Sequence, residues 1–261
     1  MFDYHLHSAV SYDGRGIPEE MIAAARSAGL KEICFTEHLD YLHCVPRTQT
    51  TYTLEAYRNA HPPRHIPGLC IRHGVEVGLT PWNHQEIQQD VAAYPYDFVL
   101  GSVHFINDED PYLPPYWVDR NPLESERQYF EEMLTCVELH DHFDVLGHLT
   151  YISKCKAHPC PRIIPLATYR DCIAQIMTVL ISKGKGIEVN TSGMDRCGDY
   201  LPGMEYLKLF KDLGGEIVTV GSDAHAPDRV GQYTSQACEI LKDIFGHVCT
   251  FEGRTPVFHK L

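Results

Sequence analysis

The chain alternates between short apolar runs and longer segments whose apolar residues recur at helical spacing. A short apolar run bounded by turn residues indicates a buried strand, whereas apolar positions three and four apart indicate a helix packed on one face. The pattern predicts seven buried strands, at residues 2–7, 32–38, 69–78, 97–104, 143–148, 186–191 and 216–221. It predicts helices at residues 17–29, 53–59, 84–93, 124–140, 166–182, 203–213 and 234–245, and a short last strand at 247–251.

The alternation of these elements predicts how the strands pair. Strands that are separated by helices are joined by crossover connections, which place neighbouring strands parallel to one another. The chain has 261 residues, close to the ~250 that single α/β barrels commonly contain. We therefore expect an α/β fold in which seven parallel strands close into a TIM-barrel-like barrel. We expect residues 1–261 to form a single domain.

Histidines and carboxylates gather at one end of the predicted strands. His5 and His7 are two residues apart on the first strand, so both side chains point to one face. Asp223 and His225 repeat this spacing just after the seventh strand. Five more candidates end or follow earlier strands: Asp13, His38, Glu76, His104 and His148. The carboxyl ends of barrel strands open into one mouth, so we expect all these side chains to meet there. A doubly wound open sheet, the alternative fold, would not bring ligands from six strands together.

The chemistry of this set points to a metal cluster. Six imidazoles and three carboxylates suit Zn²⁺, Mn²⁺ or Fe²⁺, whereas Ca²⁺ is bound by oxygen alone. Glu76 lies in an otherwise apolar run, and a carboxylate buried there needs a cation nearby. Nine ligands exceed what one ion binds and fit two or three, and paired ions about 3.5–4 Å apart clamp both oxygens of a phosphoryl displacement. The residues therefore predict a hydrolase of phosphate esters.

The net charge and the composition of the chain limit which kinds of partner we expect. A formal net charge of −13 disfavours nucleic acid. The chain has no apolar run of the ~18 residues that a membrane helix needs, and we expect no signal peptide. Cys34 and Cys249 lie in apolar strand-like runs, and no C-x-x-C pair occurs among the ten cysteines. We expect a cytoplasmic protein with reduced thiols that acts on a small-molecule phosphate ester. The sequence does not indicate an oligomeric state.

The order of the motifs resembles the polymerase and histidinol phosphatase (PHP) superfamily over nearly the whole chain. The motifs are Asp3-x-His5-x-His7-Ser8, Thr36-Glu37-His38, Gly74-x-Glu76, Gly101-Ser102-Val103-His104, Gly147-His148 and Gly221-Ser222-Asp223-Ala224-His225. The resemblance implies a distorted (β/α)₇ barrel with a three-ion site. Carried over by position, the ligands of the first ion are His5, His7, Glu76 and Asp223, those of the second are Glu76, His104 and His148, and those of the third are Asp13, His38 and His225.

Within the superfamily the chain looks most like the stand-alone histidinol-phosphate phosphatases of histidine biosynthesis. Its length and the stretches at residues 102–105 and 188–193 support this likeness. The implied reaction is the hydrolysis of L-histidinol phosphate to L-histidinol and phosphate by a hydroxide between the first two ions. Glu76 would bridge those ions, and Asp223, His225 or a water on the third ion would protonate the leaving alkoxide.

The resemblance also implies roles for residues outside the ligand set. Relatives use arginines to hold phosphate, and Arg162 and Arg196 lie in the loops after the fifth and sixth strands. A guanidinium fork matches the geometry of phosphate. We expect Asp3 to accept a hydrogen bond from a ligand imidazole and so fix its tautomer, and Glu37 to act similarly.

Two other functions fit parts of the pattern. The first is a phosphoesterase of the same kind that acts on other small phosphomonoesters or on nucleotides, since only the long loops at 39–68 and 106–122 would differ. The second is a non-catalytic, metal-stabilised interaction domain like those within some bacterial DNA polymerases. The strongly negative charge and the full set of candidate ligands favour an enzyme over this second function.

Overall fold

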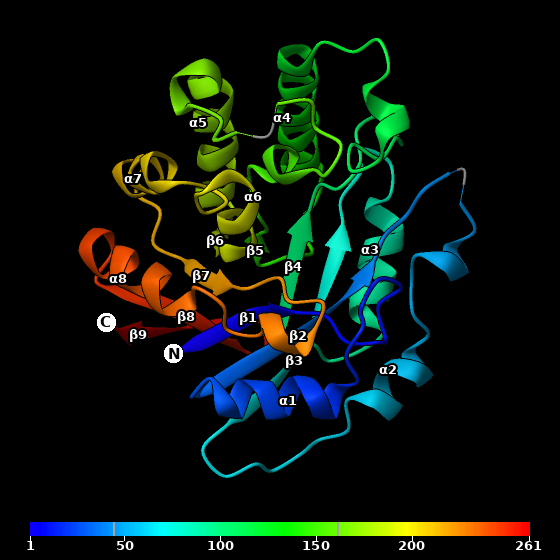
Figure 1. The fold of residues 1–261 in the computed structure, drawn as a ribbon, viewed down its shortest axis with the longest axis vertical. Helices are drawn as coiled ribbons and strands as arrows, with labels where there is room; N and C mark the ends of the chain where they lie inside the picture. Colours follow the sequence, from blue (N-terminus) through cyan, green and yellow to red (C-terminus); the bar gives the residue numbers. More distant parts are fainter. Residues whose placement is uncertain (44, 161) are drawn as a thin grey trace.

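Seven parallel strands form one sheet whose order follows the sequence. The computed structural model describes residues 1–43, 45–160 and 162–261. The strands of the sheet are β1 Phe2–Leu6, β2 Glu32–Leu39, β3 Cys70–Gly78, β4 Phe98–Ser102, β5 Val145–Leu146, β6 Gly186–Asn190 and β7 Val218–Gly221 (Figure 1). The predicted seven-stranded α/β barrel is confirmed.

The two edge strands of the sheet meet at their C-terminal ends and so close the barrel there. Leu6 and Ala224 form a parallel bridge between the end of β1 and the segment after β7. Two backbone hydrogen bonds accompany it: His7 N donates to Ala224 O at 2.9 Å, and Asp223 N donates to His5 O at 2.9 Å. The barrel is therefore joined at the end where the candidate ligands lie.

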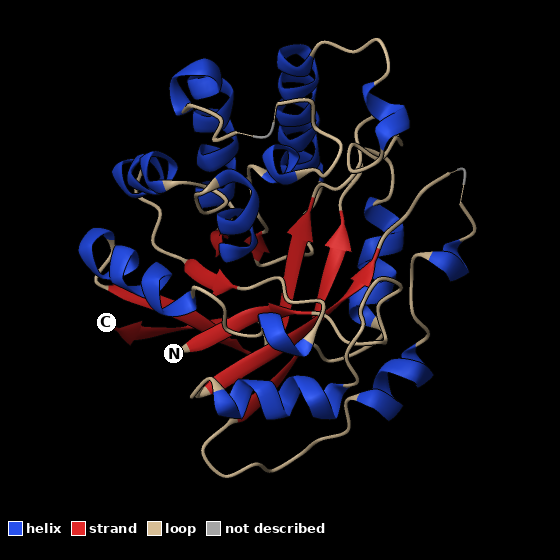
Figure 2. Ribbon diagram, in the orientation of Figure 1, coloured by secondary structure: helices blue, strands red, loops and turns tan. Residues whose placement is uncertain are grey.

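Helices connect the strands and cover the outside of the sheet (Figure 2). They are α1 Pro18–Ser27, α2 Leu54–Ala60, α3 His84–Ala92, α4 Pro122–Leu139, α5 Leu166–Ser182, α6 Met194–Cys197, α7 Met204–Asp212 and α8 Thr234–Ile244. Helix α1 begins with a proline and two glutamates, which suit the first turn of a helix and the positive end of its dipole. Its buried face places Met21 and Ile22 against Ile33 and Phe35 of β2.

Strand β5 and helix α6 differ from what the sequence predicts. The fifth strand is only two residues long, because His148 N donates to the side chain of Glu188 at 2.8 Å instead of extending the strand ladder. Helix α6 was expected to be loop, and it follows directly on a 3₁₀ turn at Thr191–Gly193. The short β5 and the irregular segment after it distort the barrel on this side.

A C-terminal hairpin closes the other end of the barrel. Its strands are β8 His247–Glu252 and β9 Thr255–Lys260, and the second of these was not predicted. The turn between them has positive φ at Gly253 and Arg254. Phe251 lies among the residues that fill the barrel interior, and its ring centre is 4.9 Å from that of Phe98. Its backbone N–H donates a hydrogen bond to Tyr4 Oη at 2.9 Å. The hairpin therefore seals the N-terminal ends of the strands.

No helix in the described residues is long and apolar enough to cross a membrane.

We predict that Phe251→Ala lowers the free energy of unfolding by about 3–5 kcal/mol, because it empties the sealed end of the barrel. Phe258→Ala, on the half-exposed strand β9, is the matched control and should cost less than about 1 kcal/mol. Denaturant unfolding followed by circular dichroism measures both changes. Equal losses in the two variants would show that Phe251 does not hold the barrel closed.

Candidate metal centre

The carboxylate of Glu76 lies at the middle of the candidate ligands. Glu76 is on β3 and is fully buried. Its Oε2 atom lies 3.1 Å from His5 Nε2, 3.1 Å from His38 Nδ1 and 3.3 Å from His7 Nε2. These three imidazoles come from the ends of β1 and β2, so one oxygen of Glu76 faces the first two strands of the barrel.

The other oxygen of Glu76 faces a second set of side chains. Its Oε1 atom lies 2.9 Å from His148 Nε2 and 3.2 Å from His104 Nε2. Ser102 Oγ donates a hydrogen bond to the same oxygen at 2.6 Å. His104 and His148 follow β4 and β5, so Glu76 lies between two groups of imidazoles and presents one oxygen to each.

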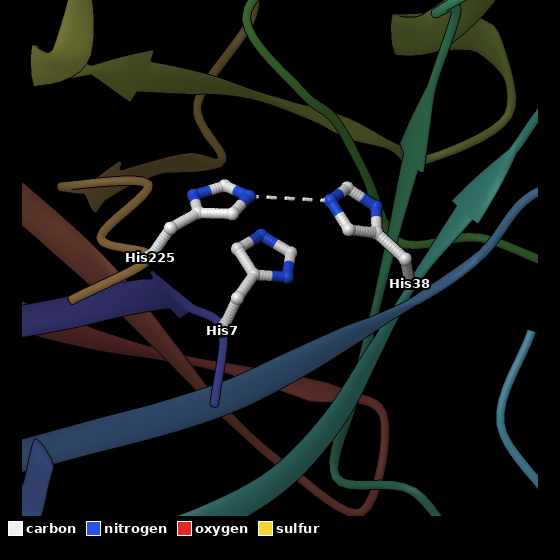
Figure 3. Close-up of side chains that lie close together, drawn as sticks. All are labelled: His7, His38 and His225. Atoms are coloured by element: carbon white, nitrogen blue, oxygen red, sulfur yellow. Dashed lines mark hydrogen bonds between the residues drawn. The ribbon is translucent and has the colours of Figure 1, made fainter. Parts of the chain in front are cut away.

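The remaining candidates extend this cluster towards the outside. Asp223 Oδ1 lies 3.5 Å from His5 Nε2 and 3.6 Å from His7 Nε2. His225 Nε2 lies 3.1 Å from Asp13 Oδ2 and 3.4 Å from His38 Nε2. The imidazoles of His7, His38 and His225 face one another (Figure 3). All nine candidates predicted from the sequence therefore come together at the C-terminal mouth of the barrel.

The charges of this cluster are mutually dependent. Burial raises the pKa of Glu76, but the surrounding imidazoles, led by His5 and His104, outweigh it and hold this pKa well below its usual range. Burial likewise raises the pKa of Asp223, whereas Lys154 and His5 lower it well below its usual range. Both carboxylates are therefore ionised and available to bind a cation.

The protonation state and hydrogen bonding of His7 show that these residues fit metal ions. Burial, with the neighbouring imidazoles of His38 and His225, lowers the pKa of His7 to about 3, so its ring is neutral. Its Nδ1 atom is 3.3 Å from Ser11 Oγ, and its buried Nε2 has no hydrogen-bond partner among the described residues. A neutral imidazole whose unpaired nitrogen points at two carboxylates is suited to bind a metal ion together with them.

Donor atoms gather closely enough for more than one ion. Four groups of three side chains have donor atoms within 4.8 Å of one another: His5–His7–Asp223, His5–Glu76–His148, His7–His38–His225 and His38–Asp40–His104. Nitrogen and carboxylate donors in such groups suit Zn²⁺, Mn²⁺ or Fe²⁺. Asp40 belongs to these groups although the sequence did not mark it.

Two buried carboxylates orient the ligand imidazoles, and sequence reasoning missed both. Glu188 on β6 lies 2.7 Å from His5 Nδ1, and Asp40 lies 2.9 Å from His104 Nδ1. An acceptor on one ring nitrogen leaves the other free for a metal. Glu188 could have been found from its position between two apolar residues of a strand, the same signal that marked Glu76.

The roles expected of Asp3 and Glu37 are wrong in detail. The register of β1 shifts between Asp3 and Leu6, so the alternation of faces does not carry from Asp3 to His5. Asp3 instead accepts 2.8 Å hydrogen bonds from Ser222 N and Gly231 N and so fixes the segment after β7.

Glu37 also contacts residues outside the ligand set. It accepts hydrogen bonds from the backbone N–H and the hydroxyl of both Ser8 and Ser11, and it lies 2.8 Å from His61 Nε2. Through the Ser11 hydroxyl, Glu37 is linked by hydrogen bonds to His7, and through His61 it attaches the end of α2 to the base of the site.

A cavity of about 980 Å³ opens above the cluster. Asp13, His38, His104, His148, Asp223 and His225 contribute to its wall. Among cationic residues the wall includes Lys154, Arg196 and Arg229. Lys154 was not predicted, and its Nζ donates to Asp223 and, at 2.8 Å, to Ser192 Oγ.

Of the two arginines expected to hold phosphate, only Arg196 lines the cavity. Arg196, on α6, lines the cavity, and its guanidinium lies 5.9 Å from the centre of the Tyr112 ring. Arg162 instead donates to both oxygens of buried Glu126, at 2.8 and 2.9 Å. Arg162 would have to leave Glu126 before it could contact a phosphate.

The chain is similar to proteins of known family along most of its length. A family model described as the PHP domain matches residues 3–192. The histidinol-phosphatase of Lactococcus lactis is 30% identical over 256 residues, which are 96% of this chain and 94% of that protein. A protein of Thermotoga maritima named "Probable histidinol-phosphatase" is 27% identical over 267 residues and covers 100% of both chains.

A solved structure agrees with these sequence relatives. The crystal structure of histidinol phosphate phosphatase from Lactococcus lactis, complexed with zinc, L-histidinol and phosphate, matches with a TM-score of 0.84 and 28% identity. The match covers 98% of each chain. The resemblance predicted from the ordered motifs is therefore confirmed, and this chain belongs to the PHP domain family.

Proposed function

We propose that this protein is a phosphoric monoester hydrolase that converts L-histidinol phosphate and water to L-histidinol and phosphate. The observation that carries the proposal is the cluster of six imidazoles and three carboxylates, centred on Glu76, below a cavity. The family and the full-length likeness to the Lactococcus lactis histidinol-phosphatase support the same substrate.

The cofactors are two or three divalent ions, Zn²⁺, Mn²⁺ or Fe²⁺, held by the nine converging side chains. We assign His5, His7, Glu76 and Asp223 to the first ion, Glu76, His104 and His148 to the second, and Asp13, His38 and His225 to the third. Such ions supply Lewis-acid stabilisation of charge on phosphoryl oxygens and lower the pKa of water. Glu76 would help to hold both of the first two ions, since its two oxygens face different imidazoles.

The protein's own residues bind and orient the ester. Of the three guanidinium groups in the cavity wall, those of Arg15, Arg196 and Arg229, we assign that of Arg196 to the phosphate. The role of Arg162 stays a prediction. Asp223 and His225 line the cavity beside the other imidazoles. The donor of the proton to the leaving alkoxide, whether Asp223, His225 or a water, stays a prediction, and an ionised Asp223 would first have to take up a proton. Glu188 and Asp40 hold the rings of His5 and His104 in the orientation that directs Nε2 inward.

The cysteines support a reducing location. The nine cysteines in the described residues are free thiols, among them the buried Cys34 and Cys249. Free thiols persist where glutathione and thioredoxin keep them reduced. We therefore propose that the protein works in the cytoplasm on a small-molecule phosphate ester.

The first prediction tests the function itself. Protein loaded with Mn²⁺ or Zn²⁺ should release phosphate from L-histidinol phosphate, and a chelated sample should lose at least about 100-fold in rate, because the cluster then cannot stabilise phosphoryl charge. Asp223→Asn should lose rate similarly, since it removes an ionised donor that faces His5 and His7. Slow turnover by a sample shown to hold two or three ions would exclude this substrate.

The second prediction concerns the carboxylate behind His5. Glu188→Gln keeps the side-chain shape but weakens the acceptor for His5 Nδ1, so metal affinity should fall about 10–100-fold. Competition with a coloured chelator measures the affinity. Glu205→Gln, on the exposed face of α7, is the control and should bind metal like the wild type. Unchanged affinity in Glu188→Gln would show that Glu188 does not support the site.

The third prediction concerns phosphate binding. Arg196→Met should raise KM for L-histidinol phosphate about 10–100-fold, because it removes a charge-assisted contact to the phosphate. Arg170→Met, on an exposed face of α5, removes the same charge elsewhere and should leave KM unchanged. If the two variants behave alike, the phosphate does not depend on Arg196.

A further inference from the structure

One carboxylate in the cavity wall, that of Asp110, lies outside the metal-ligand set. Asp110 follows β4 and is partly buried. Within residues 1–43, 45–160 and 162–261, its carboxylate accepts one hydrogen bond, from Tyr112 N to Oδ1 at 2.8 Å, and forms no ion pair. Burial raises the pKa of Asp110, with the Tyr112 N–H and the nearby His104 acting in the opposite direction. A half-buried charge of this kind lacks the partner that would compensate its burial.

The segment that carries Asp110 is fixed in place. Ile106 and Glu109 exchange backbone hydrogen bonds of 2.9 and 3.0 Å just before Asp110. Asn107 N, in the turn between them, donates to Glu132 Oε2 of α4 at 2.8 Å. Trp117 Nε1 donates to Pro111 O at 2.7 Å just after it. The carboxylate is therefore held at the cavity wall before any ligand arrives.

The other carboxylates of the cavity wall have partners or lie in water. Their pairs are Asp13 with His225, Asp195 with Arg229, and Asp223 with Lys154. Asp228 is exposed at the rim. A charge at the rim is screened by solvent, whereas the partly buried Asp110 attracts a cation more strongly. Asp110 is thus the cavity carboxylate best placed to bind a cationic ligand group.

A cation-binding and an anion-binding group both lie beside residue Tyr112. Tyr112 donates its backbone N–H to Asp110, and the Arg196 guanidinium lies 5.9 Å from the centre of its ring. In L-histidinol phosphate the carbon with the ammonium group is bonded to the carbon with the phosphate ester. The substrate therefore presents a cation beside an anion, and the cavity wall around Tyr112 offers the opposite charges, the Asp110 carboxylate at its backbone and the Arg196 guanidinium near its ring.

We infer that Asp110 binds the ammonium group of L-histidinol phosphate and so selects this substrate among phosphomonoesters. The inference rests on the proposed function, because it places the phosphate of the same molecule at the ion cluster and Arg196. An ester without the ammonium group leaves Asp110 buried and unpaired, and a site built for a polar contact rejects a ligand that lacks it.

The test compares three phosphate esters on wild type and on Asp110→Asn. They are L-histidinol phosphate, its des-amino analogue 3-(1H-imidazol-4-yl)propyl phosphate, and 4-nitrophenyl phosphate. Asp110→Asn should lower kcat/KM for L-histidinol phosphate about 10–100-fold, mainly through KM, because a charge-assisted hydrogen bond is lost. The rates on the other two esters should change less than about threefold, which also shows that the variant is folded and loaded with metal.

A matched control variant and the wild-type protein distinguish failure of this inference from failure of the proposed function. Asp228→Asn should behave like the wild type on all three esters, and a selective loss in this variant instead would assign the selection to the rim and overturn the inference. An equal loss in Asp110→Asn on all three esters, or on the des-amino analogue as well as the substrate, would also overturn it. Wild-type protein that does not prefer L-histidinol phosphate over 4-nitrophenyl phosphate would overturn the proposed function first, and the inference with it.

Discussion

The contact between the Glu76 carboxylate and five imidazoles is the constraint on which the mouth of the barrel depends. A buried carboxylate is unfavourable unless it is paired and hydrogen-bonded, and the rings around Glu76 supply both conditions. Because its two oxygens face different groups of rings, Glu76 also sets how those groups lie relative to each other. The ends of four other strands, β1, β2, β4 and β5, are thereby positioned against one side chain of β3.

Around this centre lies a second group of buried carboxylates that do not themselves face the middle of the cluster. Glu188 and Asp40 contact the outer nitrogens of His5 and His104, and Asp3 fixes the chain that presents Asp223. The close fit leaves little room, since a Cβ atom at Gly221 would lie 2.2 Å from Glu188 Oε1. The glycine before Asp223 is therefore required by the approach of β7 to this layer.

The barrel and the meeting of the nine candidate ligands could be predicted because both follow from simple periodicities. Strand alternation placed His5 and His7 together, and parallel strands brought distant ends to one mouth. The shift in the register of β1 between Asp3 and Leu6 could not be predicted, because such a shift leaves no mark in the pattern of apolar residues. As a consequence of this shift, Asp3 does not face the imidazoles.

Other features depended on contacts across long sequence separations. The pairing of Lys154 with Asp223 joins residues on separate loops, and no short motif signals it. Arg162 was placed by its loop, but its partner Glu126 lies on the far helix α4, and only the tertiary structure shows that contact. Strand β9 was missed because its outward residues are exposed and half of them polar, which weakens the apolar pattern.

The seam between β1 and β7 has a consequence for how the protein is made. The candidate ligands that meet across this seam are His5 and His7 on one side and Asp223 and His225 on the other. The two histidines of β1 leave the ribosome near the beginning of synthesis of the barrel, and the pair after β7 leaves near its end. During translation the early histidines have no carboxylate from β7 to meet. If these side chains hold the ions as we propose, the complete ion cluster requires the seventh strand, so it can form only after β7 has been synthesised.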